Sequence, residues 1–348
     1  MLRNMIRAPT AALAASPASS DDPDTAGDAT AEKRALPGAS RMRRIPPARL
    51  LVMLASAPLA QWPSLPTATE APDRAEDIPA EAVHQLRIAT RRLRALIDIF
   101  SPWLKPRWRR RMKEELRWLG NAMGPARDAD VLIGETLPAL RLEYPGVDWI
   151  AIEAHVSRLR AEARAQAAQA LSSERQHALH ALLIDAFGIC SEGRADERAA
   201  RGLRRASRTP GKAPGALARH AHNMLRERYI ALFPNCRQLA MLDTEQLHAL
   251  RVKIKQARYS AEALTPWLRK SVRAPYQDTL RAAQTLLGHL NDAVVAQRML
   301  EAAPIPADHR DMLSGRLDTI IVNATSRAAH VLCQLPDAHT LERAMRKG

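Results

Sequence analysis

Apolar residues recur every three or four positions from about residue 78 to residue 345, which is the spacing of one buried face of an α-helix. Ala, Leu, Arg, Glu and Gln dominate this region, and runs of β-branched residues are rare in it. The pattern predicts an all-α protein. We expect helices over residues 80–100, 106–123, 128–142, 148–170, 174–191, 214–232, 244–264, 273–289, 292–302, 308–333 and 337–346.

Residues 193–214 depart from this pattern, because they combine many arginines with Gly and Pro. We expect them to form a basic linker between a first half, about residues 78–192, and a second half, about residues 215–345.

Residues 1–77 are rich in Ala, Pro, Ser, Thr and Asp, so we expect a disordered, low-complexity extension. Its apolar run Leu50–Ala60 follows a cluster of arginines and would resemble a signal peptide if translation began at Met42. An amphipathic lead-in or an upstream extension is the interpretation we favour. The run is also too short to span a bilayer, and we expect no transmembrane segment.

A segment that begins near residue 80 recurs 164 residues later without a gap. A repeat that served packing alone would need only recurring apolar positions. Here one histidine and several cations recur as well, which indicates two similar halves that share a chemical task. The matching pairs are His84 and His248, Arg87 and Arg251, Arg91 and Lys255, Arg94 and Arg258, Gly124 and Gly288, and Asp128 and Asp292.

The recurring cations lie on one side of each predicted helix. On a helical wheel the first set falls within roughly 80° and lies opposite an apolar face. Like charges at this spacing cost a few tenths of a kcal/mol per pair, so the pattern favours an anionic ligand. Guanidinium groups suit phosphate oxygens in particular. The first stripe is His84, Arg87, Arg91 and Arg94, and the second stripe is His248, Arg251, Lys255 and Arg258, with Lys253 on its flank.

Composition points to the same class of partner. The net charge is +15 and the isoelectric point is about 10.6, which favours nucleic acid, an anionic membrane surface or another polyanion. The three cysteines, Cys190, Cys236 and Cys333, show no metal-binding spacing and no disulfide framework. We therefore expect a reducing, cytoplasmic environment.

A di-iron site is the sharpest competing interpretation of the histidines. Glu81-x-x-His84 and Glu245-x-x-His248 both fit the Glu-x-x-His pattern of di-iron bundles. However, an arginine stands one turn from each histidine and would repel a metal cation. No set of carboxylate, histidine and nucleophile is evident either, so we expect no metal, no cofactor and no enzymatic activity.

A glycine followed four residues later by an aspartate recurs as Gly124 with Asp128 and Gly288 with Asp292. This spacing suits a helix end followed by a new N-cap. Alternatively, the two aspartates orient arginines of the stripes, and Arg127 joins the anion site.

The order and spacing of these motifs resemble the CHAD domain, the conserved histidine α-helical domain, over about residues 78–345. The resemblance implies an antiparallel helical bundle of two duplicated halves, related by pseudo-two-fold symmetry, with a basic central cavity or groove. It also implies binding of inorganic polyphosphate and, as in some members, association with polyphosphate or polyhydroxyalkanoate granules. The implied binding residues are His84, Arg87, Arg91, Arg92, Arg94, Arg127, His248, Arg251, Lys253, Lys255 and Arg258, supported by Asp128, Asp292 and Tyr259.

Two departures from the family matter. Gln256 stands where the first half has Arg92, which weakens the second basic face. The acidic Glu-x-Glu-x-Lys signature of the CYTH triphosphatase module, often joined to this family, is absent. The prediction is therefore a non-enzymatic polyphosphate-binding protein. An RNA- or DNA-binding protein is the first alternative, although the stripes carry few stacking groups, and a phosphohydrolase is the second.

Overall fold

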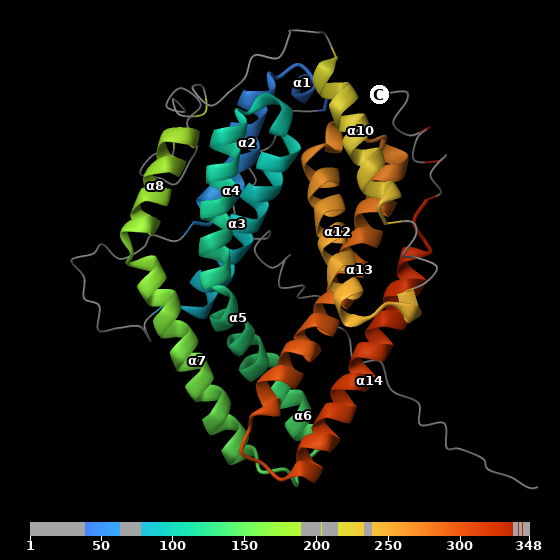
Figure 1. Ribbon diagram of the computed structural model, residues 1–348. Helices are drawn as coiled ribbons and strands as arrows, with labels where there is room; N and C mark the ends of the chain where they lie inside the picture. Colours follow the sequence, from blue (N-terminus) through green and yellow to red (C-terminus); the bar gives the residue numbers. More distant parts are fainter. Residues whose placement is uncertain are drawn as a thin grey trace, which may run out of the picture.

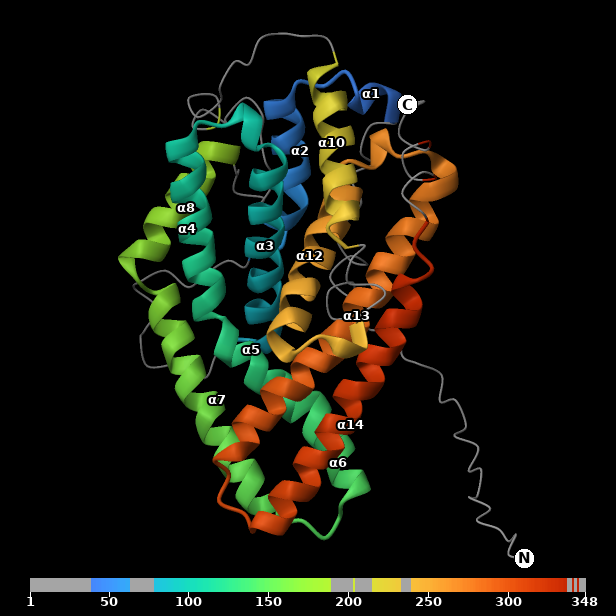
Figure 2. The ribbon, with the colours of Figure 1, turned by 45° about the vertical axis from the view of Figure 1, so that its right-hand side comes forward.

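The computed structural model describes residues 39–62, 78–188, 203, 215–232, 239–336, 340 and 343 of the chain. Within these residues every regular element is a helix, which agrees with the predicted all-α class. Figures 1 and 2 show two groups of helices that stand side by side and come together at one end of the molecule.

The first group is α2 (Pro47–Ala60), α3 (Ala80–Ile99), α4 (Pro106–Ala122), α7 (Trp149–Leu171) and α8 (Glu174–Phe187). A 3-10 turn, η3 (Ser101–Trp103), joins α3 to α4, and Gly188 ends α8 in the left-handed conformation. The second group is α10 (Ala216–Ile230), α12 (Thr244–Ala263), α13 (Lys270–Glu301) and α14 (Ala307–Leu332). The turns η5 (Leu239–Met241) and η6 (Thr265–Trp267) lie before and after α12.

Three short segments lead from α4 to the end where the groups meet. They are α5 (Gly124–Val131), the π-helical turn η4 (Leu132–Thr136) and α6 (Leu137–Glu143). Figure 1 shows α6 beside the crossing of α13 and α14. A second core cluster forms here, in which Leu137 of α6 and Trp149 of α7 pack with Leu300 and Leu317 of the second group.

The predicted boundaries hold best in the recurring segment. α12 begins and ends 164 residues after α3, and η6 lies 164 residues after η3, as the repeat requires. One predicted break is wrong. We expected separate helices over 273–289 and 292–302, whereas α13 runs through Gly288 without interruption. A single glycine lowers helix stability by about 1 kcal/mol, which the packing of a 32-residue helix can offset.

The expectation for residues 1–77 is wrong for part of its length. Residues 39–62 include α1 (Ala39–Met42) and α2, and α2 packs along α3. Leu50, Leu51 and Ala55 are fully buried in the main core. The apolar run that could be mistaken for a signal peptide is therefore a core helix. Its apolar side chains are buried against α3, which no local pattern reveals.

Arg43, the residue directly after α1, reaches the second group, where it donates from Nε and Nη2 to the carbonyl of Pro266 at 2.9 and 2.6 Å. The predicted basic linker lies almost wholly outside the described residues, as do most of the expected helix 337–346 and residues 1–38 and 63–77.

Candidate functional site

The centre of the candidate site is Arg87, on the face of α3 that turns toward α12. Burial lowers the pKa of Arg87, and the neighbouring cations Arg91, Arg251 and Arg127 lower it further, while Asp128 opposes them. The guanidinium remains protonated, because the ordinary arginine pKa is far above neutrality. Cations from α3, α5 and α12 therefore act on the guanidinium of Arg87, although they are far apart in the sequence. We call these four residues, Arg87, Arg91, Arg127 and Arg251, the central cation cluster.

The α5 segment holds Arg87 in place. Nη2 of Arg87 lies 3.9 Å from Oδ1 of Asp128. A β-carbon added at Gly124 would lie 3.0 Å from Nη1 of Arg87, so a larger residue there would require the guanidinium to shift by a few tenths of an ångström. Asp128 lies inside α5 and caps no helix. The capping interpretation of this motif is therefore wrong, and the geometry fits an aspartate that orients an arginine.

The equivalent motif in α13 has different surroundings. Asp292 also lies inside a helix, and Arg251 attracts its carboxylate. Burial raises the pKa of Asp292, and Glu135 raises it further, whereas Arg251, a hydrogen bond from Asn291 and His289 act in the opposite direction. No atom outside the helix lies within 4 Å of a β-carbon added at Gly288. The two motifs thus share an arginine–aspartate pairing, but only Gly124 is needed for space.

Arg91 connects the two groups of helices directly. Its Nε donates to the hydroxyl of Tyr259 at 2.8 Å, across the contact between α3 and α12. Tyr259 is itself buried, and the guanidinium of Arg258 lies 5.1 Å from the centre of its ring. Tyr259 therefore positions cations, as a supporting residue would.

Arg258 is buried, although the helical wheel assigned it to the cationic face of α12. Only 2 % of its side chain is exposed, and Nε lies 3.6 Å from Oε1 of Glu262 one turn later. A ligand arriving from solvent cannot touch this side chain in the structure. The wheel gave the direction of Arg258 around α12, but it could not show that neighbouring helices cover that direction near the helix end.

The two histidines also differ. His84 is buried, whereas His248 is exposed near the start of α12. Arg92, Arg94, Lys253 and Lys255 are all half-buried. The repeat therefore places equivalent residues in unequal surroundings.

The Glu-x-x-His pattern does not form a metal site among the described residues. Glu81 accepts a hydrogen bond from Gln85, one turn later on the exposed side of α3. Across the described part of the chain, no three His, Cys, Asp or Glu side chains converge as metal ligands would. Cys333 is exposed and forms no disulfide, and Cys190 and Cys236 lie outside the described residues.

Two residues of this region were not predicted. Glu135 lies in the π-helical turn, with Oε1 3.8 Å from Nη2 of Arg127, and it also acts on Asp292. Its sequence neighbours gave no signal of this role. Arg117 on α4 acts electrostatically on Arg94. Arg117 belongs to the repeat, matching Arg281, and that match was the available signal.

A cavity of about 790 Å³ lies away from these cations, between α6 and the start of α7. Its lining is mostly apolar and includes Leu142 and Ile150. This cavity is not the predicted basic groove.

Comparison with known proteins identifies the family. The CHAD domain matches residues 67–301, which is well over half of the chain. The chain belongs to the CHAD domain family. The match begins ahead of the expected boundary at residue 78, and it includes both stripes and both arginine–aspartate motifs.

Solved structures share the CHAD fold at low identity. The CHAD domain from the plant Ricinus communis is 23% identical, with a TM-score of 0.50, and the alignment covers 86% of this chain and 92% of that one. PptA from Streptomyces chartreusis is also 23% identical, with a TM-score of 0.54, covering 83% and 98%. No curated protein matches the chain. Within the described residues, no helix is both long and apolar enough to cross a membrane.

Proposed function

We propose that this CHAD protein binds inorganic polyphosphate, without turning it over, in a basic groove between two duplicated halves. The observation that carries the proposal is the central cation cluster. Arg91 and Arg127 of the first half and Arg251 of the second all act electrostatically on Arg87. Their mutual repulsion raises the free energy of the unliganded protein, and a polyanion relieves it.

Inorganic polyphosphate fits this arrangement better than nucleic acid does. Its repeating unit presents charged oxygens and no bases, so a binding site needs cations but no stacking groups. Tyr259, the nearest aromatic residue, is 6% exposed, and its hydroxyl accepts from Arg91. A base therefore has no exposed ring to stack on at this point.

Localisation follows from this proposal. A protein that binds polyphosphate in the cytoplasm would collect where that polymer is stored, so we propose association with polyphosphate or polyhydroxyalkanoate granules.

The test is competition binding in two salt concentrations. Labelled long-chain polyphosphate is bound to the full chain and displaced by unlabelled polyphosphate, single-stranded RNA or pyrophosphate. Long polyphosphate should displace the label at a lower phosphate concentration than RNA does. Equal displacement per phosphate would reduce the function to general polyanion binding, and release of orthophosphate by clean protein would overturn the non-enzymatic assignment.

Charge reversal tests the location. Arg87→Glu with Arg251→Glu should lower the affinity for polyphosphate at least tenfold, since both side chains would then repel the phosphates. The matched control is Arg219→Glu with Arg327→Glu, which makes the same charge change at exposed positions on α10 and α14. Circular dichroism checks that each variant is folded. Equal losses in the two pairs would show that net charge, and not the cluster, binds the ligand.

A further inference from the structure

Arg94 and Arg117 lie next to each other on α3 and α4, beyond the central cation cluster. Two contacts fix how these antiparallel helices align. A β-carbon at Gly120 would lie 3.2 Å from Oγ1 of Thr90, and Nζ of Lys113 lies 2.5 Å from Oδ1 of Asp98. Arg94 lies on α3 between Thr90 and Asp98, and Arg117 lies on α4 between Lys113 and Gly120. The two contacts therefore bring Arg94 beside Arg117.

The carboxylate of Asp98, one turn after Arg94, pairs with Lys113 at 2.5 Å. Arg117 is exposed, and no carboxylate of the described residues lies within ion-pair distance of either guanidinium. Burial lowers the pKa of Arg94, and the charge of Arg117 lowers it further, with Asp98 acting weakly in the opposite direction. Nε of Arg94 is buried and has no hydrogen-bond partner.

The two equivalent arginines of the second half both have a carboxylate partner. Arg258 pairs with Glu262 at 3.6 Å, and Arg281 pairs with Asp278 at 2.7 Å. Gln277 occupies the position that corresponds to Lys113. Its amide donates to the carbonyl of Ala261 and does not pair with Glu262, so Glu262 can pair with Arg258. The second half therefore differs from the first at two of the four corresponding positions, with Glu262 in place of Asp98 and Gln277 in place of Lys113, and both of its arginines have a carboxylate within 4 Å.

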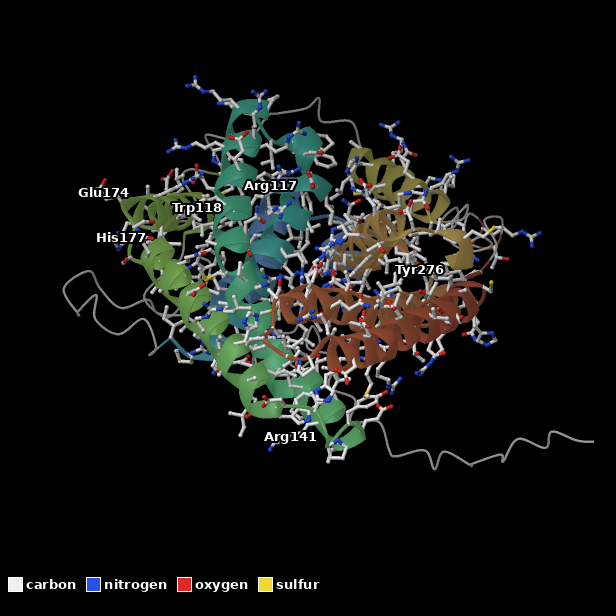
Figure 3. The ribbon with its side chains drawn as sticks, turned by 60° about the horizontal axis from the view of Figure 1, so that its bottom comes forward. Arg117, Trp118, Arg141, Glu174, His177 and Tyr276 are labelled. Atoms are coloured by element: carbon white, nitrogen blue, oxygen red, sulfur yellow. The ribbon has the colours of Figure 1, made fainter. Side chains whose placement is uncertain are left out.

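We infer that Arg94 and Arg117 form an outer phosphate subsite that extends the polyphosphate path from the central cation cluster along α3 and α4. This inference rests on the proposed function. Arg94 stands seven residues after Arg87, which is about 10 Å along a helix at 1.5 Å per residue. Only a ligand of several linked phosphates reaches from one to the other, so the subsite gives the protein a preference for longer chains. Figure 3 shows Arg117 and Trp118 on α4, with His177 and Glu174 on the adjacent α8.

The experiment compares Arg117→Gln with Arg281→Gln. Both variants remove one arginine at matching positions of the repeat, so they change net charge equally, although Arg117 is exposed and Arg281 is half-buried. Arg117→Gln should weaken binding of long-chain polyphosphate about threefold to tenfold and leave pyrophosphate binding unchanged, since pyrophosphate is too short to span both clusters. Arg281→Gln should leave both unchanged.

The outcomes separate this inference from the proposed function. If wild-type protein binds polyphosphate and both glutamine variants behave like it, the outer subsite is wrong and the central cluster stands. The subsite is also wrong if the two variants lose equal affinity, or if Arg117→Gln weakens pyrophosphate as much as the long chain. If wild-type protein does not bind polyphosphate at all, the proposed function itself is wrong.

Discussion

At the scale of single residues, the cations of this CHAD protein differ from one another mainly in how closely a carboxylate pairs with each of them. Arg87 has a loose contact with Asp128, Arg94 has no close carboxylate, and Arg258 is buried against Glu262. A loosely paired arginine keeps donors available for a phosphate oxygen, whereas a buried ion pair does not. Residue identity alone would have ranked all three equally.

The space beside Arg87 gives the first prediction. Gly124→Ala should push the guanidinium away from α5 and weaken polyphosphate binding several-fold, because its new β-carbon would lie 3.0 Å from Nη1. Gly288→Ala is the matched control. It should leave binding unchanged and stabilise α13 by about 0.5–1 kcal/mol, since alanine is the better helix former and nothing lies within 4 Å. Binding titrations and denaturant unfolding measure the two effects, and equal affinities would refute the role of Gly124.

Asp292 gives a prediction about pH. Burial raises the pKa of its carboxyl, so the folded protein binds that proton more tightly than the unfolded chain does. Ionised Asp292 therefore destabilises the fold at neutral pH, and this cost disappears as pH falls through the raised pKa toward the ordinary value. Asp292→Asn should be more stable than wild type at pH 7, and the difference should shrink in acid.

Thermal unfolding across a pH series measures that difference. The control is Asp311→Asn, at an exposed position of α14, which should follow wild type. A less stable Asp292→Asn protein at pH 7 would mean that attraction to Arg251 outweighs the cost of burial.

At the scale of elements, the helices that present the central cation cluster depend on partner helices that carry none of its four cations. α3 has α2 on one side and α4 on another, and α12 packs with α10 and α13. The π-helical turn between α5 and α6 places Glu135 near Arg127 and Asp292. Such a turn inserts an extra residue into the helical repeat and changes the direction of the side chains that follow it.

The burial of α2 predicts that this segment stabilises the folded protein. Leu51→Ala should lower the free energy of unfolding by about 2–5 kcal/mol, as expected when a fully buried leucine is truncated. Leu142→Ala makes the same chemical change at a side chain that is 88% exposed and should cost less than about 0.5 kcal/mol. Denaturant unfolding of both variants gives the comparison. A small loss for Leu51→Ala would show that α2 is not part of the cooperative core.

At the scale of the whole molecule, contacts at both ends hold the two groups of helices together. Arg43, directly after α1, reaches the turn that follows α12, and Arg91 donates to Tyr259 between α3 and α12. The second core cluster joins α6 and α7 to α13 and α14. These links keep the central cations close to one another in spite of their repulsion. The cluster is therefore assembled before any ligand arrives, which lowers the entropic cost of binding.

The net charge of +15 and the shared cluster predict a steep dependence of binding on salt. By analogy with single-stranded nucleic acid, each neutralised phosphate contributes about −0.7 to the slope of log affinity against log salt. Contacts from Arg87, Arg91, Arg127, Arg251 and Lys255 would together give a slope of roughly −3 to −4. Affinities measured at four or more salt concentrations test this value. A slope near zero would contradict ionic binding of any polyanion.

The sequence by itself determined the helices of the recurring segment, the amphipathic character of α3 and α12, and the family. These properties depend on residues close together in the chain, where spacing of 3.6 residues fixes the direction of each side chain. The equal spacing of the repeat also determined which residues correspond.

Only the tertiary structure decided how those corresponding residues differ. Burial of Arg258, the space at Gly124 and the position of Glu135 all depend on contacts between helices distant in sequence. The α2 helix was missed for the same reason, because its apolar residues can be recognised as core residues only from their packing against α3. Burial and electrostatic interaction depend on distance through space, and a repeat in sequence does not make those distances equal.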